Sequence, residues 1–205
     1  MPTRRTLQQF ADDLAAVLPA VDAETTGQYG AGLGSEDEAD QLTALLEALR
    51  ATNRGYEAVE REVPYPDREA SCDLLLQDGL PVEAKLLRYW RANGDPEPHM
   101  YTHVFSPFTS NTLLTDARRL AEASWTDTSG LLGLFYSRSD DDPESVPELP
   151  ERFTPTDLAE KVVQDIDYWY DIEAEVAQIA EVDGLQHSVH RSGAVITWVI
   201  RSDHV

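Results

Sequence analysis

The segment GLLGLFYSR, residues 130–138, is apolar along almost its whole length and constrains the fold more than any other feature. A strand of this composition belongs inside a sheet that is covered on both faces. Amphipathic helical patterns occur on either side of it along the chain, around residues 7–18, 36–52, 111–125 and 156–182. The sequence therefore predicts an α/β fold, in which helices flank a central mixed β-sheet within a single domain spanning residues 1–205.

The predicted order of elements is helix, helix, strand, strand, strand, helix, strand, helix, strand, strand. Ser35 is the expected N-cap of the second helix, with Glu36, Asp37 and Glu38 in its first turn. Residues 140–155 are acidic and rich in proline, which is typical of a surface loop. The last helix is expected at 156–182, followed by a hairpin at 185–201 that turns at Ser192-Gly193.

The composition is strongly acidic, with 38 Asp and Glu against 16 Lys and Arg and a formal net charge of −22. The acidity has two candidate explanations: mimicry of DNA, or adaptation to high salt of the kind seen in proteins of salt-loving archaea. The acidic residues are spread along the chain, which favours adaptation to salt. At molar salt the Debye length is only about 3 Å, so a diffuse surface charge hardly repels DNA.

The cysteine content and the absence of long apolar runs limit the other classes of protein. Cys72 is the single cysteine, which excludes an intramolecular disulfide and a zinc site built from cysteines, and we expect it to be a small buried residue. The sequence has no apolar run of transmembrane length. These features predict a cytoplasmic protein without a membrane partner.

The segment SCDLLLQDGLPVEAKLLRYW, residues 71–90, reads as a hairpin of two apolar strands that carries three charged residues. A three-residue loop, 77–79, with Gly79 in the left-handed position, would pair Leu76 with Leu80. In that register Asp73 pairs with Glu83, and the side chains of Asp73, Glu83 and Lys85 are expected to converge on one face of the sheet. Leu74, Leu76, Val82, Ala84 and Leu86 then form the core face.

Two adjacent carboxylates repel each other unless a cation or a proton neutralises them. Asp73 and Glu83 are therefore candidate ligands of Mg²⁺ or Mn²⁺, and the backbone carbonyl of Ala84 is a further candidate. A lysine beside such a cation can orient or deprotonate an attacking water. Lys85 is one of only two lysines in the chain, which makes its place on this strand informative.

This arrangement resembles the PD-(D/E)XK, or restriction-endonuclease-like, nucleases. The matching residues are Asp73 followed by Glu83-Ala84-Lys85, within a core at about 36–138. In that superfamily an upstream helix often donates a glutamate, which would be Glu38 or Glu36 here. Cys72 stands where a proline often precedes the aspartate, at a variable position. Residues 106–120 and 185–200 are also similar to segments of uncharacterised prokaryotic members.

The resemblance implies a nuclease that acts on DNA with Mg²⁺ or Mn²⁺, alone or as a homodimer. Its catalytic residues would be Asp73, Glu83, Lys85 and Glu38. Residues that are candidates for contacts with nucleic acid are Arg88, Arg118, Arg119, His187 and His190. The spacing of the two histidines places them on opposite faces of a regular strand, which argues against a shared metal.

Two other functions are compatible with the sequence. The first is a nuclease-like module that binds or assembles without catalysis, although the intact Asp, Glu and Lys argue against it. The second is an acidic protein that mimics DNA, which would need no lysine beside a pair of carboxylates.

The spread of the acidic residues makes a prediction about salt. If they reflect adaptation to high salt, screening relieves their mutual repulsion, and the midpoint of thermal unfolding should rise from low to molar KCl. Circular dichroism or calorimetry across that range measures it. A midpoint that stays constant or falls would favour a functional reason for the acidity, and hence the mimic.

Overall fold

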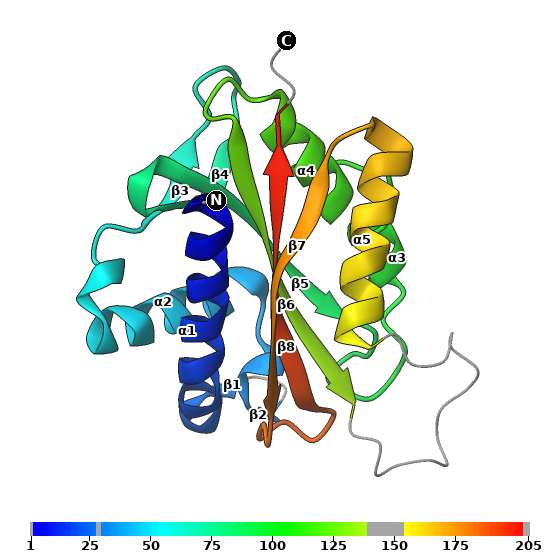
Figure 1. Cartoon of the computed structure of the whole chain (residues 1–205). Helices are drawn as coiled ribbons and strands as arrows, with labels where there is room; N and C mark the ends of the chain where they lie inside the picture. Colours follow the sequence, from blue (N-terminus) through cyan, green and yellow to red (C-terminus); the bar gives the residue numbers. More distant parts are fainter. Residues whose placement is uncertain (1, 28–29, 139–153, 203–205) are drawn as a thin grey trace.

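The computed structural model describes residues 2–27, 30–138 and 154–202 (Figure 1). Most of the predicted acidic loop at 140–155 therefore lies outside the described residues. The α/β class is confirmed: helices flank a six-stranded mixed sheet in the order β3-β4-β5-β6-β8-β7. The strands of this sheet are β3 (Glu60–Pro64), β4 (Ser71–Leu76), β5 (Leu80–Arg88), β6 (Thr128–Arg138), β7 (Ala174–Asp183) and β8 (His190–Arg201).

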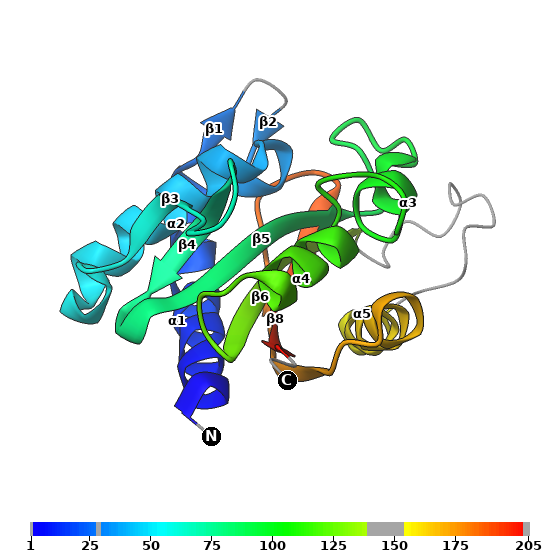
Figure 2. The same cartoon turned by 90° about the horizontal axis from the view of Figure 1, so that it is seen from above.

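The helices form a layer on each face of this sheet (Figure 2). α1 (Pro2–Glu24) and α2 (Glu38–Thr52) contribute to one hydrophobic core, whereas α4 (Leu113–Glu122) and α5 (Pro155–Tyr170) contribute to the other. A short helix, α3 (His99–His103), precedes α4, and a small hairpin of β1 (Thr26–Gly27) and β2 (Gly30–Ala31) follows α1. Among the described helices, none is long and apolar enough to cross a membrane.

β6 is buried on both faces, as its composition predicted. Leu132 and Leu134 pack in the core under α1 and α2, and Leu131 and Phe135 pack in the core under α4 and α5. Its neighbours run in different directions, since β5 is parallel to β6 and β8 is antiparallel to it. The parallel pair requires a crossover, and α4 lies within that connection.

The β4–β5 hairpin has the predicted register. Leu76 pairs with Leu80 across the three-residue connection, and Leu74 pairs with Val82. Gly79 has a φ of 73° and Asp78 a φ of 62°, so two successive residues occupy the left-handed region. Apolar side chains of both strands lie in the core under α1 and α2, as expected for Leu74, Leu76, Val82, Ala84 and Leu86.

The predictions for the C-terminal third need correction. The expected helix at 156–182 ends at Tyr170, because Asp171 adopts a left-handed conformation, and residues 174–183 form β7 instead. The expected turn at Ser192-Gly193 lies inside β8, where Gly193 pairs with Tyr136. A Cβ on Gly193 would lie 2.2 Å from the carbonyl oxygen of Phe135, so this glycine permits close strand packing rather than a turn.

The start of α2 also differs from the prediction. Asp37, not Ser35, is the N-cap, and its side chain accepts a hydrogen bond from the amide of Asp40 at 2.9 Å. Ser35 belongs to a buried 3-10 turn at Leu33–Ser35. The shift places Glu38 at the first helical position, where its side chain can reach the sheet.

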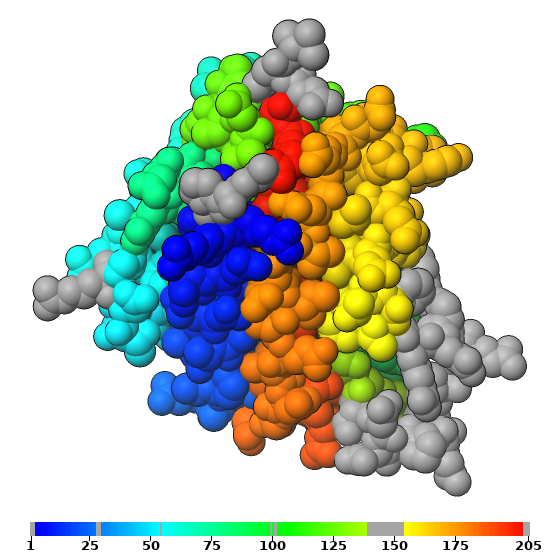
Figure 3. Space-filling view, in the orientation of Figure 1, coloured from blue at the N-terminus to red at the C-terminus, as the bar shows by residue number. Residues whose placement is uncertain are grey.

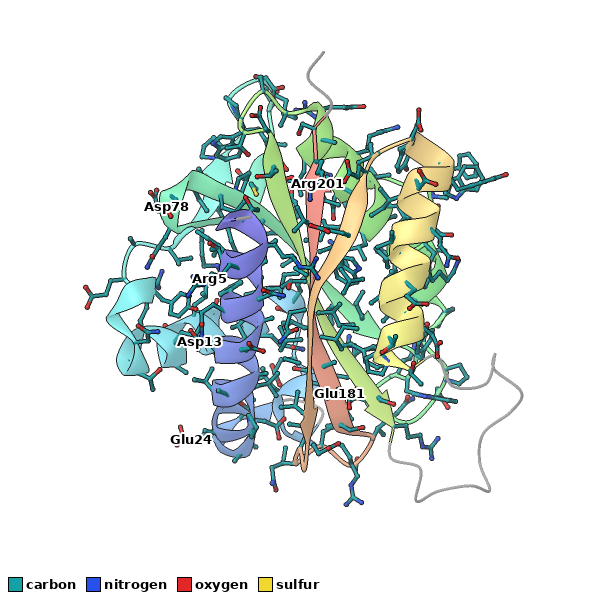
Figure 4. All side chains as sticks on the ribbon, in the orientation of Figure 1. Arg5, Asp13, Glu24, Asp78, Glu181 and Arg201 are labelled. Atoms are coloured by element: carbon teal, nitrogen blue, oxygen red, sulfur yellow. The ribbon has the colours of Figure 1, made fainter. Side chains whose placement is uncertain are left out.

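The left-handed pair at the hairpin tip makes a prediction about stability. A Cβ on Gly79 would meet nothing within 4 Å, so Gly79→Ala adds only the conformational cost of a left-handed residue. We expect it to lower the free energy of unfolding by about 1–2 kcal/mol. Asp78→Gly, at the neighbouring position labelled in Figure 4, relieves a positive φ and should be neutral or stabilising.

Urea denaturation of both variants measures the difference. Equal losses of stability for Gly79→Ala and Asp78→Gly would show that the loop does not require left-handed backbone.

Candidate active site

The candidate site lies where β4 and β5 separate. The pairing between them ends at Leu74 and Val82, and beyond this pair two carboxylates take the place of a partner strand. The amide of Ala84 donates to Asp73 Oδ2 at 2.7 Å, and the amide of Leu86 donates to Glu38 Oε2 at 2.6 Å. Since amides of alternate residues point to the same side of a strand, the acids satisfy successive donors along one open edge.

A twist in β4 directs Asp73 toward this edge. Cys72, buried as predicted, belongs to the core under α4 and α5, whereas Leu74 belongs to the core under α1 and α2. Positions two apart in a regular strand share a face, so the chain rotates between them. Glu62, on β3 across from Asp73, has a φ of 52°. Asp73 therefore reaches the edge of β5, where it accepts from the amide of Ala84 and contacts Glu83.

Asp73 and Glu83 are in hydrogen-bonding contact, and Glu83 is 3% exposed. Burial raises the pKa of Glu83, and the charge of Asp73, its hydrogen bond to Glu83 and the charge of Asp116 raise it further, to about 8. The hydroxyl of Tyr65, which donates to Glu83 Oε1 at 2.6 Å, opposes this effect. Without another cation, this pair of carboxylates retains a proton at neutral pH.

Lys85 lies between carboxylates supplied by two different helices. Its Nζ is 3.7 Å from Glu38 Oε1 on α2 and 3.3 Å from Asp116 Oδ2 on α4. Burial lowers the pKa of Lys85, but Asp116, Glu38 and Asp73 outweigh burial and raise it above its ordinary value. Lys85 is therefore an ammonium ion in this arrangement.

Arg119 forms the second cationic contact of the cluster. Its guanidinium lies 3.1 Å from Glu83 Oε1 and 3.0 Å from Asp116 Oδ1, and it also donates to Asn111 Oδ1 at 3.1 Å. Arg119 was predicted to contact phosphate, and in this structure its charge is directed into the site.

The cluster has an excess of negative charge. With every carboxylate ionised, its four carboxylates and two cations leave a formal charge of −2; the proton that the Asp73–Glu83 pair retains without another cation reduces this to −1. The carboxylates are Glu38, Asp73, Glu83 and Asp116, and the cations are Lys85 and Arg119. Burial of this excess is unfavourable without a counter-charge, and a divalent cation carries that charge.

The structure distinguishes between the two helix glutamates. Glu38 contacts both Lys85 and the amide of Leu86, whereas the Glu36 side chain accepts a hydrogen bond from Ser35 Oγ at 3.4 Å. Glu38 is therefore the acid of this helix that joins the cluster.

The other predicted contact residues lie around the cluster. Arg88 donates to the carbonyl of Gly34 at 2.8 Å and lines a cavity of about 450 Å³ together with Glu38, Lys85 and Asn111. Arg118 lies on α4, where it pairs with Glu122 at 3.7 Å and lines a separate cavity of about 370 Å³. Arg119 lines that second cavity as well.

The prediction that His187 and His190 contact nucleic acid is wrong, because both side chains are buried, at 1% and 0% exposure. Their rings stack with centroids 4.7 Å apart, so they do not lie on opposite faces of a strand either. His187 precedes β8, and its Nδ1 accepts from the amides of Val189 and His190. His190 Nε2 lies 2.9 Å from the carbonyl oxygen of Trp90. These contacts give the pair a structural role.

Asp116 and Tyr65 were missed in the sequence. Asp116 offered a signal, since it lies on the apolar side of α4 among Leu113, Ala117 and Leu120, where a carboxylate requires a partner. Tyr65 follows β3 in an irregular segment, where no periodicity identifies the direction of its side chain.

The residues present fit a divalent cation of the Mg²⁺ type. Asp73 and Glu83 provide hard oxygen donors in mutual contact, and the Ala84 carbonyl points to the same side of β5 as its amide. Within the described ranges, no three His, Cys, Asp or Glu side chains are grouped to hold a metal. Two carboxylates completed by backbone, water and phosphate are a common Mg²⁺ environment.

Comparisons of the chain with protein-family models, with curated proteins and with solved structures find no match.

The raised pKa of Glu83 predicts how the stability of the metal-free protein depends on pH. Folded Glu83 keeps its proton up to a pH of about 8, whereas the unfolded side chain loses it near 4.5. The folded state thus binds more protons between these values, and its stability should fall as pH rises through this window, by at most about 1.4 kcal/mol per pH unit. Glu83→Gln should reduce that dependence.

Urea denaturation in EDTA at several pH values between 5 and 8 measures this effect. Glu24→Gln, at the exposed end of α1 labelled in Figure 4, is the matched control and should follow the wild type. Parallel profiles for Glu83→Gln and the wild type would mean that Glu83 is ionised throughout.

Proposed function

We propose that the chain is a metal-dependent nuclease of the restriction-endonuclease-like type that hydrolyses phosphodiester bonds in DNA. One observation carries the proposal: Asp73, Glu83 and Lys85 meet Glu38 at the edge where β4 and β5 separate. This is the set of residues on which the sequence resemblance rests. As a DNA-acting enzyme with an acidic surface, the protein would work in a prokaryotic cytoplasm at high salt.

Asp73 and Glu83 would hold the cation, with the carbonyl of Ala84 as a third donor. Mg²⁺ or Mn²⁺ bound there would supply positive charge to the phosphate and would lower the pKa of a coordinated water. With all four carboxylates ionised the cluster has a formal charge of −2, and this charge supports a divalent ion that would displace the retained proton.

Lys85 would act as a donor rather than as a base. Its carboxylate neighbours hold it as an ammonium, so it can orient the attacking water and stabilise charge that develops on a phosphate oxygen. Asp116 and Glu38 position this ammonium from opposite helix layers. Their contacts restrict the side chain, which lowers the entropy lost on reaching the transition state.

Tyr65 and Arg119 would position Glu83. Both donate to Glu83 Oε1, which leaves Oε2 as the oxygen available to a cation on the side of Asp73. Arg119 also contacts Asp116, so it links the residue that holds the cation to the residue that holds Lys85.

A non-catalytic nuclease-like module is the second candidate. It is favoured by the internal ion pairs, because Lys85 and Arg119 each contact two carboxylates and could serve stability alone. The DNA-mimic alternative does not account for a buried cluster that combines carboxylates with two cations.

The test is cleavage of DNA by purified protein with Mg²⁺ or Mn²⁺, which EDTA should stop. Asp73→Asn and Glu83→Gln keep the shape of the site but remove charge, so activity should fall by at least about 100-fold. Lys85→Ala should abolish cleavage while the protein still binds Mn²⁺, as measured by calorimetry. Lys161→Ala, which removes the other lysine at a partly exposed position on α5, is the matched control.

All variants must be purified in parallel with the wild type, because contaminating nuclease would imitate activity. If the three site variants cut DNA and RNA as fast as the wild type, the nuclease proposal fails. If the wild type binds DNA and cleaves no substrate, the non-catalytic module is the better account.

A further inference from the structure

Three large aromatic side chains are exposed beside the candidate active site. Among the described residues, the large apolar side chains with high exposure are Phe108 at 84%, Tyr168 at 78% and Trp169 at 43%. Phe108 lies in the α3–α4 connection, and the other two lie at the end of α5, on the same face of the sheet (Figure 2). Their rings form a chain of edge-on contacts, with centroids 5.4 Å apart for Phe108–Trp169 and 5.0 Å for Tyr168–Trp169.

Tyr170 fixes this aromatic group in place. Its hydroxyl donates to the carbonyl of Pro107 at 3.1 Å, which attaches the α3–α4 connection to α5 next to Phe108. The guanidinium of Arg118 lies 5.1 Å from the centre of the Tyr170 ring. The exposed rings therefore belong to a held surface that also presents a cation, and we refer to Phe108, Tyr168 and Trp169 as the aromatic platform.

The platform adjoins the cavity of about 370 Å³. Phe108, Thr115 and three arginines, Arg68, Arg118 and Arg119, are among the residues that line it. Arg119 also contacts Glu83, so one side chain connects this cavity to the candidate catalytic carboxylates. Three of the 14 arginines of a chain with a net charge of −22 thus gather at one cavity.

We propose that the aromatic platform and this cavity bind a single-stranded segment of nucleic acid, with unpaired bases stacked on the rings and a phosphate near the arginines. The inference rests on the proposed function, because it names the substrate class of that same site. Each base offers a π-face to an aromatic ring, and arginines beside such rings bind the backbone. A duplex keeps its bases stacked inside and offers none to the platform.

The net charge of the chain supports stacking as the main source of affinity. A charge of −22 repels a polyanion at low salt, and at high salt the contribution of phosphate contacts falls because counterion release is weakened. Stacking depends much less on ionic strength than phosphate contacts do. The aromatic platform can supply stacking because its rings are exposed, and a ligand that binds there replaces few existing contacts of Phe108, Tyr168 and Trp169.

Glu122 limits the positive charge of the cavity. It lines the cavity and lies 3.7 Å from Arg118 and 3.9 Å from Arg68. Glu122→Gln should release both guanidinium groups toward a phosphate and tighten binding. Removal of an exposed acid far from the cavity should leave the affinity for nucleic acid unchanged.

The experiment measures binding in EDTA, so that no metal-dependent cleavage occurs. The probe is a fluorescein-labelled oligothymidylate of roughly 15 nucleotides, compared by anisotropy with a hairpin duplex of equal charge and with oligouridylate. We expect the single strand to bind more tightly than the duplex. Trp169→Ala should weaken it about 10-fold, and Trp169→Phe should retain most of the affinity.

Matched variants separate stacking from charge. Tyr168→Ala and Phe108→Ala should also weaken binding, with little effect on folding because both side chains are largely exposed. Arg118→Ala should weaken binding, whereas Arg5→Ala, an exposed arginine on α1 labelled in Figure 4, should not. Oligouridylate binding equal to that of oligothymidylate would extend the substrate class to RNA.

The outcomes distinguish this inference from the proposed function. If binding of the single strand depends on Trp169 but the protein cleaves no substrate, the aromatic platform is supported and the nuclease proposal is rejected. Cleavage of duplex DNA that is unaffected by Trp169→Ala would support the nuclease and overturn the platform. If ultracentrifugation shows a dimer that Trp169→Ala dissociates while single-strand affinity stays the same, the rings are an interface between copies and the inference is wrong.

Discussion

The site depends on two hydrogen bonds between carboxylates and the open edge of β5. Asp73 and Glu38 accept from the amides of Ala84 and Leu86, beyond the Leu74–Val82 pair at which the described pairing of β4 and β5 ends. A buried amide without a hydrogen-bond partner costs free energy, so the two carboxylates stabilise the fold by accepting from these amides. The same hydrogen bonds fix the positions of the carboxylates. The same bonds place negative charge beside Glu83, and Lys85 and Arg119 make ion pairs with this group of carboxylates.

The sheet and both helix layers each supply part of this cluster. Glu38 comes from α2 on one face, Asp116 and Arg119 come from α4 on the other, and Lys85 contacts acids from both. Such a contact is available only where a strand has no neighbour on one side, because a complete sheet separates its two layers. The separation of β4 and β5 therefore explains the position of the site, the raised pKa of Glu83 and the charged state of Lys85.

The sequence predicted those parts of the structure that follow from local pattern. The hairpin register followed from Gly79 and the burial of β6 from its apolar run, and the charged residues of the hairpin, Asp73, Glu83 and Lys85, lie near one another. Asp116 and Tyr65 join the site through tertiary packing, which strand or helix periodicity does not reveal. The helix predicted through 182 failed because Asp171 adopts a left-handed backbone that its side chain tolerates, and Gly193 was read as a turn although it serves close strand packing.

The two outer strands have a consequence for self-association. β3 carries Glu60, Glu62 with its positive φ, and Pro64, whereas β7 carries acidic side chains and an irregular register at Val176/Gln178. In Figure 3, β7 lies between α1 and α5, so a helix flanks it on each side. Like charges, a distorted backbone and flanking helices all oppose the addition of a further strand. A second copy, or a misfolded neighbour, would thus find no ready template for continuing this sheet, which protects so acidic a chain from fibrous aggregation when salt screens its repulsion.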